Sequence, residues 1–535
     1  MSEGAETARV AAAASPWTPL QSPLFRGLWI ATIVSNVGTW MQDVGAGWLM
    51  TSLSASPSIV ALVEAADSLP VMLLAIPAGA LADIIDRRRL LIAAQIYLML
   101  VAGALAVVTI FALTTPWVLL GFVFALGVGA AIVAPAWSAI VPDLVRPDDL
   151  QSAIALNAIG INVSRAIGPA IAGVLVAFVG AWLVFVLNAL SYIAIIAVLL
   201  QWRREHKKST LPAERFVSAI RVGMRFVMHT RALQIVLVRG AAFFVFASST
   251  WALFPLIVRR ELERGPEVYG FLLTCIGVGA IGGAMMLPRL RARFSRDALV
   301  AGATVLYAIA ALTLAHVHSV GLLAVAMLAT GVAWMAIVST LQVSAQLTLP
   351  AWVRARGLAA FVTVFLGGMA LGAILWGQVA TWTGIPLALT LAAGGMVAAL
   401  ALTWQLRIGD RQALDFTPTM DWPLPALAEA PEPDVPVLVT IEYRIRSDKR
   451  TEFVAAMQDV RRMRRRNGAY FWQLVHDSED PTRFIECFMD ESWLEHLRQH
   501  ERASVADRNV LNRAKAFLAE GESTKSTHWL GDREQ

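Results

Sequence analysis

The sequence predicts an all-α membrane protein with twelve transmembrane helices in two six-helix halves, followed by a small α+β domain. Three observations predict this fold class. Apolar segments of membrane-spanning length recur up to about residue 410, positive charge gathers in every second gap between them, and the composition then changes to that of a soluble chain. The overall composition agrees, because 57% of the residues are hydrophobic and only 16% are charged, whereas a soluble globular chain carries roughly 25% charge.

The membrane segments are identified by length, since a helix needs about 20 predominantly apolar residues to cross a bilayer. Twelve segments meet this requirement before residue 410. They are Gly27–Met50, Ser58–Ala82, Leu90–Thr114, Trp117–Val141, Leu150–Val179, Trp182–Trp202, Ala232–Val258, Tyr269–Pro288, Ala298–His316, Val320–Leu347, Gly357–Trp382 and Ile385–Leu406.

The charges between these segments predict the orientation. The odd-numbered gaps are short and nearly uncharged, apart from Arg259, Arg260 and Arg264 in the seventh gap. The even-numbered gaps and the carboxyl flank carry Arg87, Arg88, Arg89, Arg146, Arg203, Arg204, Lys207, Lys208, Arg289, Arg291, Arg293, Arg296, Arg354, Arg356, Arg407 and Arg411. Positive charge marks the cytoplasmic side, so we expect a multi-pass protein of the plasma (inner) membrane with both termini in the cytoplasm.

An internal repeat supports the division into halves. The stretch AIVPDLVRPDDL ends the fourth segment and LTLPAWVRARGL ends the tenth, so that Pro142 aligns with Pro350 and Arg146 with Arg354. Parallel repeats of this kind relate the two halves of many transporters. The predicted organisation is a disordered tail (1–21), a first six-helix half (22–202), a cytoplasmic loop with an amphipathic helix (203–231), a second half (232–409), a proline-rich linker (410–436) and a cytoplasmic domain (437–535).

The loop of residues 203–231 contains apolar side chains at helical spacing, Phe216, Ile220, Met224 and Val227, surrounded by arginines. A basic amphipathic helix of this kind is typical of the inner membrane face. A plain structural linker helix is an equally good interpretation.

The domain after the linker alternates strand-like and helix-like patterns. Val437–Arg446 alternates apolar and polar residues, Lys449–Arg466 has one apolar helical face, and Ala469–His476 pairs with Thr482–Asp490. Helices and a last strand follow, which gives the order βαββαβ of a ferredoxin-like unit. The pattern resembles small domains of the antibiotic-biosynthesis-monooxygenase type, and that resemblance implies a possible homodimer through this domain.

His496 and His500 are four residues apart on a predicted helix, which is metal-ligand spacing. No third ligand is apparent near them in the sequence, and Glu495, Arg498 and Glu501 favour a solvated, charged helix face. We therefore predict no metal and no cofactor. The absence of a Gly-Lys-Ser/Thr loop argues against ATP, and the placement of the basic residues at the ends of spans argues against nucleic acid.

The stretch GALADIIDRRRL, Gly79–Leu90, lies between the second and third spans and places two acids beside three arginines. Gly79 is expected to let the helix end approach a neighbour closely. The stretch resembles the loop of major facilitator transporters with the pattern Gly-x-Leu-Ala-Asp-x-x-Asp/Gly-Arg-Arg/Lys. The matching residues are Gly79, Leu81, Ala82, Asp83, Asp86, Arg87 and Arg88. The resemblance implies a conformational gate formed by Gly79, Asp83, Asp86, Arg87 and Arg88. A loop that merely orients two spans is the alternative.

The first span, with Trp40, Met41, Gln42 and Trp48, resembles the branch of major facilitators that includes the enterobactin exporter and other transmembrane secretion effectors. The resemblance covers about Leu24–Leu406. It implies export of a small amphipathic molecule, such as a drug or a siderophore, driven by protons.

Ionisable side chains within spans are the candidates for a proton or substrate pathway, because each costs roughly 2.5–3.5 kcal/mol at the helix centre. They are Asp43, Glu64, Asp67, Arg165 and Arg239. Glu64 and Asp67 are three residues apart and share one helix face. Each of the five could instead belong to an ion pair between helices.

Arg165 lies in NVSRAIGPAIAG, where Gly168, Pro169 and Gly173 resemble the Gly-Pro element in the fifth helix of proton-coupled exporters. The second glycine of the closing pair is missing. An ion pair between Arg165 and an acid of the first half is the structural alternative.

Two functions remain open at this point. The first is a secondary transporter that exports a small molecule, with the carboxyl-terminal domain as an accessory. The second is a membrane-anchored fusion in which that domain is a monooxygenase-like or haem-handling enzyme. The domain shows no catalytic constellation, so the sequence favours a transporter that is not an enzyme.

Overall fold

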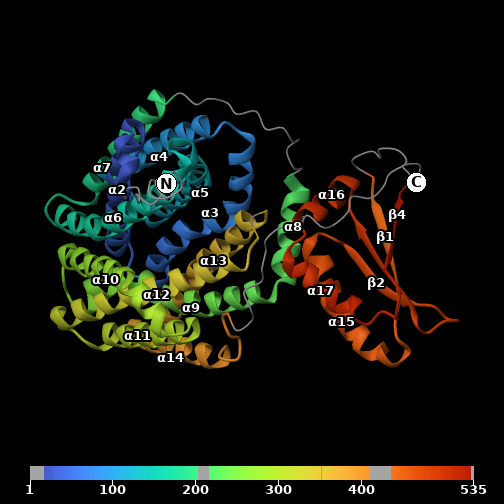
Figure 1. The fold of residues 1–535 in the computed structure, drawn as a ribbon. Helices are drawn as coiled ribbons and strands as arrows, with labels where there is room; N and C mark the ends of the chain where they lie inside the picture. Colours follow the sequence, from blue (N-terminus) through green and yellow to red (C-terminus); the bar gives the residue numbers. More distant parts are fainter. Residues whose placement is uncertain (1–16, 203–215, 351, 410–434, 532–535) are drawn as a thin grey trace, which may run out of the picture. The chain divides into compact units, whose positions relative to one another are not determined.

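The computed structural model describes residues 17–202, 216–350, 352–409 and 435–531 (Figure 1). The chain forms two compact units, which are described separately. The first unit comprises Met1–Thr210, Val238–Leu341 and Phe361–Leu406. The second comprises Leu211–Leu237, Gln342–Ala360 and Arg407–Gln535. Most of the predicted tail and linker and part of the 203–231 loop lie outside the described residues. At the end of the predicted disordered tail, Thr18–Gln21 form a short 3-10 helix.

All twelve predicted spans are helices in the structure. In the amino-terminal half they are α2 (Pro23–Leu53), α3 (Pro57–Ile84), α4 (Arg87–Ile110), α5 (Pro116–Leu144), α6 (Leu150–Phe178) and α7 (Ala181–Gln201). In the carboxyl-terminal half they are α9 (Arg231–Leu256), α10 (Pro266–Arg293), α11 (Arg296–His316), α12 (Val320–Leu347), α13 (Arg354–Thr383) and α14 (Ile385–Leu402).

Eleven of these helices are long and apolar enough to cross a membrane, counted over the described residues. The remaining helix, α2, is 31 residues long and packs against α6 and α7 of the same half. It contains Arg26, Gln42 and Asp43, which lower its mean hydropathy. A multi-pass membrane protein is therefore confirmed, and the count of twelve spans stays a prediction.

Local sequence explains where many helices begin. Asp86 accepts a hydrogen bond from the backbone N–H of Arg89 at 2.9 Å and caps α4, and Ser295 caps α11 in the same way at 3.2 Å. Proline occupies the first position of α3 and α5, where its missing N–H costs nothing.

The predicted end of the eighth span is wrong. The eighth span was expected to end at Pro288, with a basic loop after it, but α10 continues to Arg293. Hydropathy reports the thickness of the bilayer, whereas Arg and Leu are good helix formers. The helix therefore continues beyond the expected apolar span.

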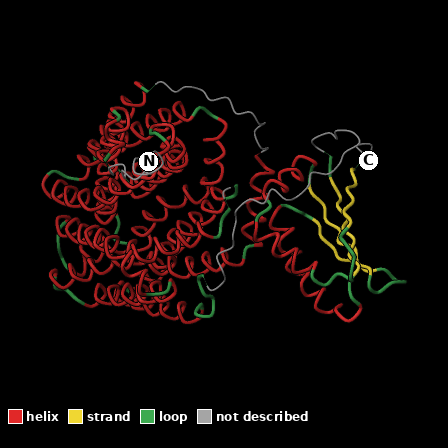
Figure 2. Tube along the Cα trace, in the orientation of Figure 1, coloured by secondary structure: helices red, strands yellow, loops and turns green. Residues whose placement is uncertain are grey.

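The second unit contains a four-stranded antiparallel sheet and the helices that cover one of its faces (Figures 1 and 2). Its elements are α8 (Phe216–His229), β1 (Val437–Arg444), α15 (Arg450–Asn467), β2 (Phe471–His476), β3 (Arg483–Asp490), α16 (Trp493–Arg502), α17 (Val505–Lys515) and β4 (Lys525–Leu530). The strands follow the order β2-β3-β1-β4. The predicted strands and helices are all present, with two short helices between β3 and β4.

Strand register determines which side chains meet the helices. Val439 of β1 lies opposite Phe488 of β3 and His528 of β4, and Phe488 lies opposite Trp472 of β2. Val439, Phe488 and Trp472 belong to the buried core, which also includes Phe453 of α15. This row therefore defines the helix-covered face of the sheet.

The amphipathic helix expected in the 203–231 loop is present as α8, and it packs against α15. Arg225 donates to the carbonyl of Gly468 at 2.9 Å and to Glu491 at 2.7 Å, and Arg221 donates to the same carboxylate at 3.0 Å. Burial by itself would raise the pKa of Glu491, but the two arginines lower it overall. The basic side of α8 therefore contacts the carboxyl-terminal domain. Contact of α8 with the membrane surface stays a prediction.

Candidate functional site

The structure brings together the three acids predicted within spans of the amino-terminal half. Asp43 lies on α2, and Glu64 and Asp67 lie one turn apart on α3. Asp43 is within range of electrostatic repulsion from both of the other carboxyl groups, and Glu64 is within range of Asp67. Asp43 and Asp67 are exposed although they lie in the interior of long helices. The three acids form one cluster, called here the acidic trio.

Two tyrosines of the carboxyl-terminal half approach this trio. Tyr269 of α10 is within electrostatic range of Glu64 and Asp43, and Tyr307 of α11 is within range of Glu64. Tyr269 also stacks on Trp48 of α2, with ring centroids 6.0 Å apart. The acidic trio therefore lies close to the contact between the two halves.

Arg165 of α6 does not pair with an acid among the described residues. Its guanidinium lies over the ring of Trp40, 5.3 Å from the centroid, and its Nε is buried with no hydrogen-bond partner in the part of the chain that is described. A cation over an indole ring is attracted by the negative face of the ring. The expected alternative for Arg165, an ion pair with an acid of the first half, is therefore not found.

Arg239 of α9 has a different environment. It forms an ion pair with Asp297 at the start of α11, and its side chain is only 2% exposed. Its guanidinium also donates to the carbonyl of Leu406 at 3.4 Å. This arrangement matches the structural alternative for Arg239, so its place in a pathway stays a prediction with less support than that of the acidic trio.

The predicted gate residues mainly stabilise helix ends within the amino-terminal half. Asp86 caps α4, and Arg87 lies 4.0 Å from Asp143 of α5. Arg88 donates to the carbonyls of Leu199 and Leu200 at 2.7 and 2.9 Å, which are at the end of α7. These contacts hold the ends of α4, α5 and α7 together.

The other two gate residues give less information. Nothing described lies within 4 Å of a Cβ placed on Gly79, so the described residues show no close approach there. The side chain of Asp83 lies outside what the structure describes. The gate therefore stays a prediction.

Glycines allow the two halves to meet closely at the crossing of α6 and α10. A Cβ on Gly270 would lie 2.3 Å from the carbonyl oxygen of Pro169 and 2.8 Å from the Cα of Gly173. A Cβ on Gly277 would lie 2.7 Å from the Cα of Ala166. The Gly-Pro element that was predicted as functional is thus where one half packs directly on the other, as small residues allow in membranes.

The halves also meet at the end of the bundle that carries the short, nearly uncharged loops. Ser58 of α3 lies 2.5 Å from Thr381 of α13, hydroxyl to hydroxyl. Arg259 donates to Thr51 at 3.0 Å, and its guanidinium lies over Trp48. Arg260 donates to the carbonyl of Ala55. Arg259 and Arg260 are two of the three arginines in the seventh gap, where a nearly uncharged loop was expected. Both donate to residues of the amino-terminal half.

An aromatic cluster lies within the carboxyl-terminal half. Trp334 of α12 lies 5.5 Å from Trp251 and 5.9 Å from Phe365, and Phe365 lies 4.5 Å from Phe244, measured between ring centroids. Trp251 and Phe365 are only partly buried. Such rings supply large apolar contact surfaces together with polar N–H groups.

The sequence-based interpretation missed Tyr269, Tyr307 and this aromatic cluster. Each lies in an apolar span, where an aromatic residue is ordinary.

The fold and this site define a multi-pass membrane protein built like a transporter from two helical halves. A family model described as transmembrane secretion effector matches residues 14–535, and the chain therefore belongs to this family. The match extends beyond the predicted limit of Leu406 and includes the carboxyl-terminal domain. That domain is thus part of the family pattern, and a monooxygenase-type assignment is not supported by the comparison.

Curated relatives are transporters. The chain is 28% identical over 257 residues to the staphyloferrin A transporter of Staphylococcus aureus, which covers 48% of this chain and 64% of that protein. That match spans less than two thirds of the relative. The multidrug efflux pump Tap of Mycobacterium tuberculosis is 24% identical over 416 residues, or 73% of this chain and 94% of the pump. The macrolide efflux protein A of Streptococcus pyogenes is 22% identical over 273 residues, or 49% of this chain and 65% of that protein.

Solved structures show the same fold. A bacterial homologue of the human lysosomal transporter Spinster, inward-facing and occupied, superposes with a TM-score of 0.59 at 15% identity, over 72% of this chain and 97% of that chain. The nucleoside transporter NupG superposes with a TM-score of 0.54 at 12% identity, over 72% and 98%. The family and its relatives favour a transporter over the enzyme alternative.

Proposed function

We propose that this chain is a secondary active transporter of the major facilitator type, with twelve spans and both termini in the cytoplasm. It exports a small amphipathic molecule by alternating access, and protons drive the export. The observation that carries this proposal is the acidic trio, which gathers on α2 and α3 near the contact between the halves. Intramembrane acids are costly, so they are functional candidates by default.

The lack of a positive partner for the trio among the described arginines supports protons as the coupling ion. Like charges at short range repel one another, and a bilayer interior screens them poorly. Neither intramembrane arginine among the candidates neutralises the trio in the described structure, since Arg165 lies over Trp40 and Arg239 pairs with Asp297. Proton binding is then the simplest way to reduce the charge. Asp67 lies nine residues beyond Ser58, about 14 Å along α3, near the centre of a bilayer about 30 Å thick.

The conformation agrees with an inward-facing state. The halves meet at Ser58 and Thr381 on the side of the uncharged loops, which the charge pattern predicts to be outside. Gly79, Asp83, Asp86, Arg87 and Arg88 would then form a gate at the inner end, closing when the transporter opens outward.

The aromatic cluster around Trp334 supports an amphipathic, partly aromatic cargo. The names of the relatives give staphyloferrin A, multiple drugs and macrolides as their substrates. Siderophore-like molecules and drugs are therefore the substrate classes to test first.

The carboxyl-terminal domain is proposed to be a ferredoxin-like module that forms a homodimer. Its sheet face opposite the helices carries a cross-strand row of Phe471, Met489, Leu438 and Trp529, and Trp529 is 57% exposed in the described part of the chain. Light scattering of the purified chain should show a dimer that Trp529→Glu weakens and Thr527→Ser does not. A monomeric parent protein would remove this part of the proposal.

The transport proposal is tested in two steps. An efflux-deficient host that expresses the chain is first exposed to a panel of toxic compounds and siderophore-like chelators, which identifies a cargo. Export of that cargo is then measured in proteoliposomes with an imposed pH gradient. Asp67→Asn and Glu64→Gln should abolish gradient-driven export and leave counterflow exchange largely intact.

Glu267→Gln is the matched control, because this exposed acid in the first turn of α10 is not among the charged groups that act on the trio. It should export at the parental rate. If Asp67→Asn and Glu64→Gln also export at the parental rate, coupling through this pair is excluded, and Asp43 is the next residue to test.

A further inference from the structure

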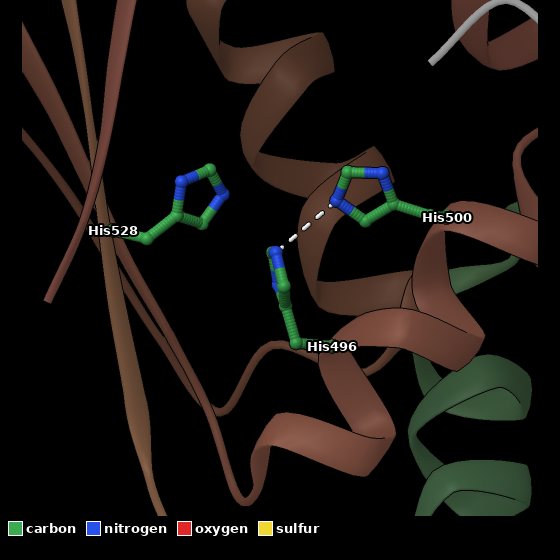
Figure 3. Close-up of side chains that lie close together, drawn as sticks. All are labelled: His496, His500 and His528. Atoms are coloured by element: carbon green, nitrogen blue, oxygen red, sulfur yellow. Dashed lines mark hydrogen bonds between the residues drawn. The ribbon is translucent and has the colours of Figure 1, made fainter. Parts of the chain in front are cut away.

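Three histidines of the carboxyl-terminal domain lie close together (Figure 3). His496 and His500 lie one turn apart on α16, and His528 lies on β4. One ring nitrogen of each lies within 4.8 Å of those of the others. The earlier interpretation of this helix as a solvated, charged face is wrong at its centre, because His496 is only 1% exposed.

Sheet register explains the third histidine. His528 lies opposite Val439 of β1, in the row that faces the helices. Ser492 caps α16 by accepting the N–H of Glu495 at 3.2 Å, which fixes the start of the helix. His496 then faces the sheet, and its ring lies 5.0 Å from that of His528, centroid to centroid.

Asp490 at the end of β3 fixes the orientation of His496. The Nδ1 of His496 lies 2.8 Å from a carboxylate oxygen of Asp490, and both side chains are buried. A carboxylate accepts hydrogen bonds, so Nδ1 carries a proton, and Nε2 is the nitrogen that the neutral ring can offer to an ion. That Nε2 lies 3.1 Å from Nε2 of His500. A ligating histidine whose other nitrogen donates to a carboxylate is a common arrangement in metal sites.

We propose that His496, His500 and His528 bind one divalent transition-metal ion of the Zn²⁺ class, with Asp490 as the positioning residue. Imidazole nitrogen suits Zn²⁺. Two nitrogens of a tetrahedral zinc site with Zn–N bonds of about 2.0–2.1 Å are about 3.3 Å apart, close to the separation between His496 and His500. Three protein ligands leave a fourth position for water or a small anionic ligand.

The competing explanation is a hydrogen-bonded histidine cluster that holds no ion. In that arrangement a single proton links Nε2 of His496 to Nε2 of His500. A metal ion would instead bind both lone pairs and also connect α16 to β4. Stoichiometric binding that depends on His528 separates the two explanations, because His528 makes no hydrogen bond to His496 or His500 in the described structure.

The experiment uses the full chain purified in detergent without a polyhistidine tag and stripped with a chelator. Zn²⁺ is titrated by calorimetry, and Co²⁺ is used as a spectroscopic probe of coordination. The parent protein should bind one ion per chain and give the visible absorption of four-coordinate Co²⁺. His500→Gln and His528→Gln should each weaken binding at least tenfold, and Asp490→Asn should weaken it about 10–100-fold.

His476→Gln is the matched control, since His476 is an exposed histidine of the same domain on β2. It should bind as the parent does. If a substitution prevents folding, the Co²⁺ spectrum and stoichiometry of the parent still decide the question. The proposal is overturned if the parent binds no ion at micromolar Zn²⁺, or if folded His528→Gln keeps the parental affinity and spectrum.

Discussion

The crossing of α6 and α10 yields a prediction whose size follows from the geometry. Gly270→Ala would place a methyl group 2.3 Å from the carbonyl oxygen of Pro169 and 2.8 Å from the Cα of Gly173. An ordinary contact between carbon atoms is about 3.5–4.0 Å. Both neighbours are backbone atoms, so no side chain can rotate away. One helix must therefore shift by about 1 Å.

Two free energies oppose one another in this variant. Overpacking of a well-packed contact costs about 1–3 kcal/mol, whereas alanine is favoured over glycine in a helix by about 0.8–1.0 kcal/mol. Gly282 on the same helix has nothing described within 4 Å of an added Cβ. Gly282→Ala therefore gains the helix propensity of alanine without the cost of overpacking. The two variants should therefore differ by the overpacking term, about 1–3 kcal/mol.

The assay is thermal unfolding of the two purified variants in one detergent, together with efflux in cells. Gly270→Ala should unfold at a lower temperature than the parent and export more slowly. Gly282→Ala should unfold at the parental temperature or above it. Equal stability and equal efflux of the two variants would refute the assignment of Gly270 to a close contact between the halves.

Three further predictions concern the conformation, the orientation and the carboxyl-terminal domain. Ser58→Cys with Thr381→Cys, in a chain whose Cys275 and Cys487 are replaced by serine, should form a disulfide under mild oxidation and lose export until a reductant is added, because the two hydroxyls lie 2.5 Å apart; failure to cross-link would contradict closure at this end. A cysteine at Ser54 should be labelled from outside the cell and one at Lys207 only after the cell is opened, and the reverse pattern would overturn the orientation. Glu486→Gln should destabilise the domain by about 3–5 kcal/mol, measured by denaturant unfolding, since it removes the charge that holds buried Arg464 at 3.0 Å; Glu479→Gln, at the turn before β3, should have no measurable effect.

The reason for that last expectation is a buried polar network. Glu486 accepts hydrogen bonds from Arg464, Tyr443 and Trp472 at 2.9–3.0 Å. Burial alone would lower the pKa of Arg464, but Glu486 and Tyr443 raise it overall. The arginine therefore stays charged, and loss of its partner leaves an uncompensated charge in the core.

Much of the fold could be predicted because it depends on local patterns. The twelve apolar segments gave twelve helices, and the alternation of residues in the carboxyl-terminal domain gave its four strands. The end of α10 was missed for a physical reason. Pro288 and the arginines after it end the apolar segment but not the helix, which continues to Arg293.

The candidate site was predictable only in part, because a sequence identifies costly residues and not their partners. Arg165 and Arg239 look alike in sequence, as single arginines within apolar segments. The structure places the first over an indole ring and the second against a carboxylate. Only Arg239 has its charge compensated by a direct ion pair in the described structure. Substitutions of Arg165 and Arg239 should therefore cost different amounts of folding free energy.

The same limit applies more strongly to the histidines, and it shows what kind of information was missing. His496 and His500 are neighbours because of helical periodicity, which the sequence reveals. His528 joins them because β4 pairs with β1 in a register that places it on the helix-covered face. A shift of one residue in that register would turn His528 to the opposite face. The third ligand thus depends on long-range strand pairing, which no local spacing encodes, and the metal site could be inferred only once the sheet was known.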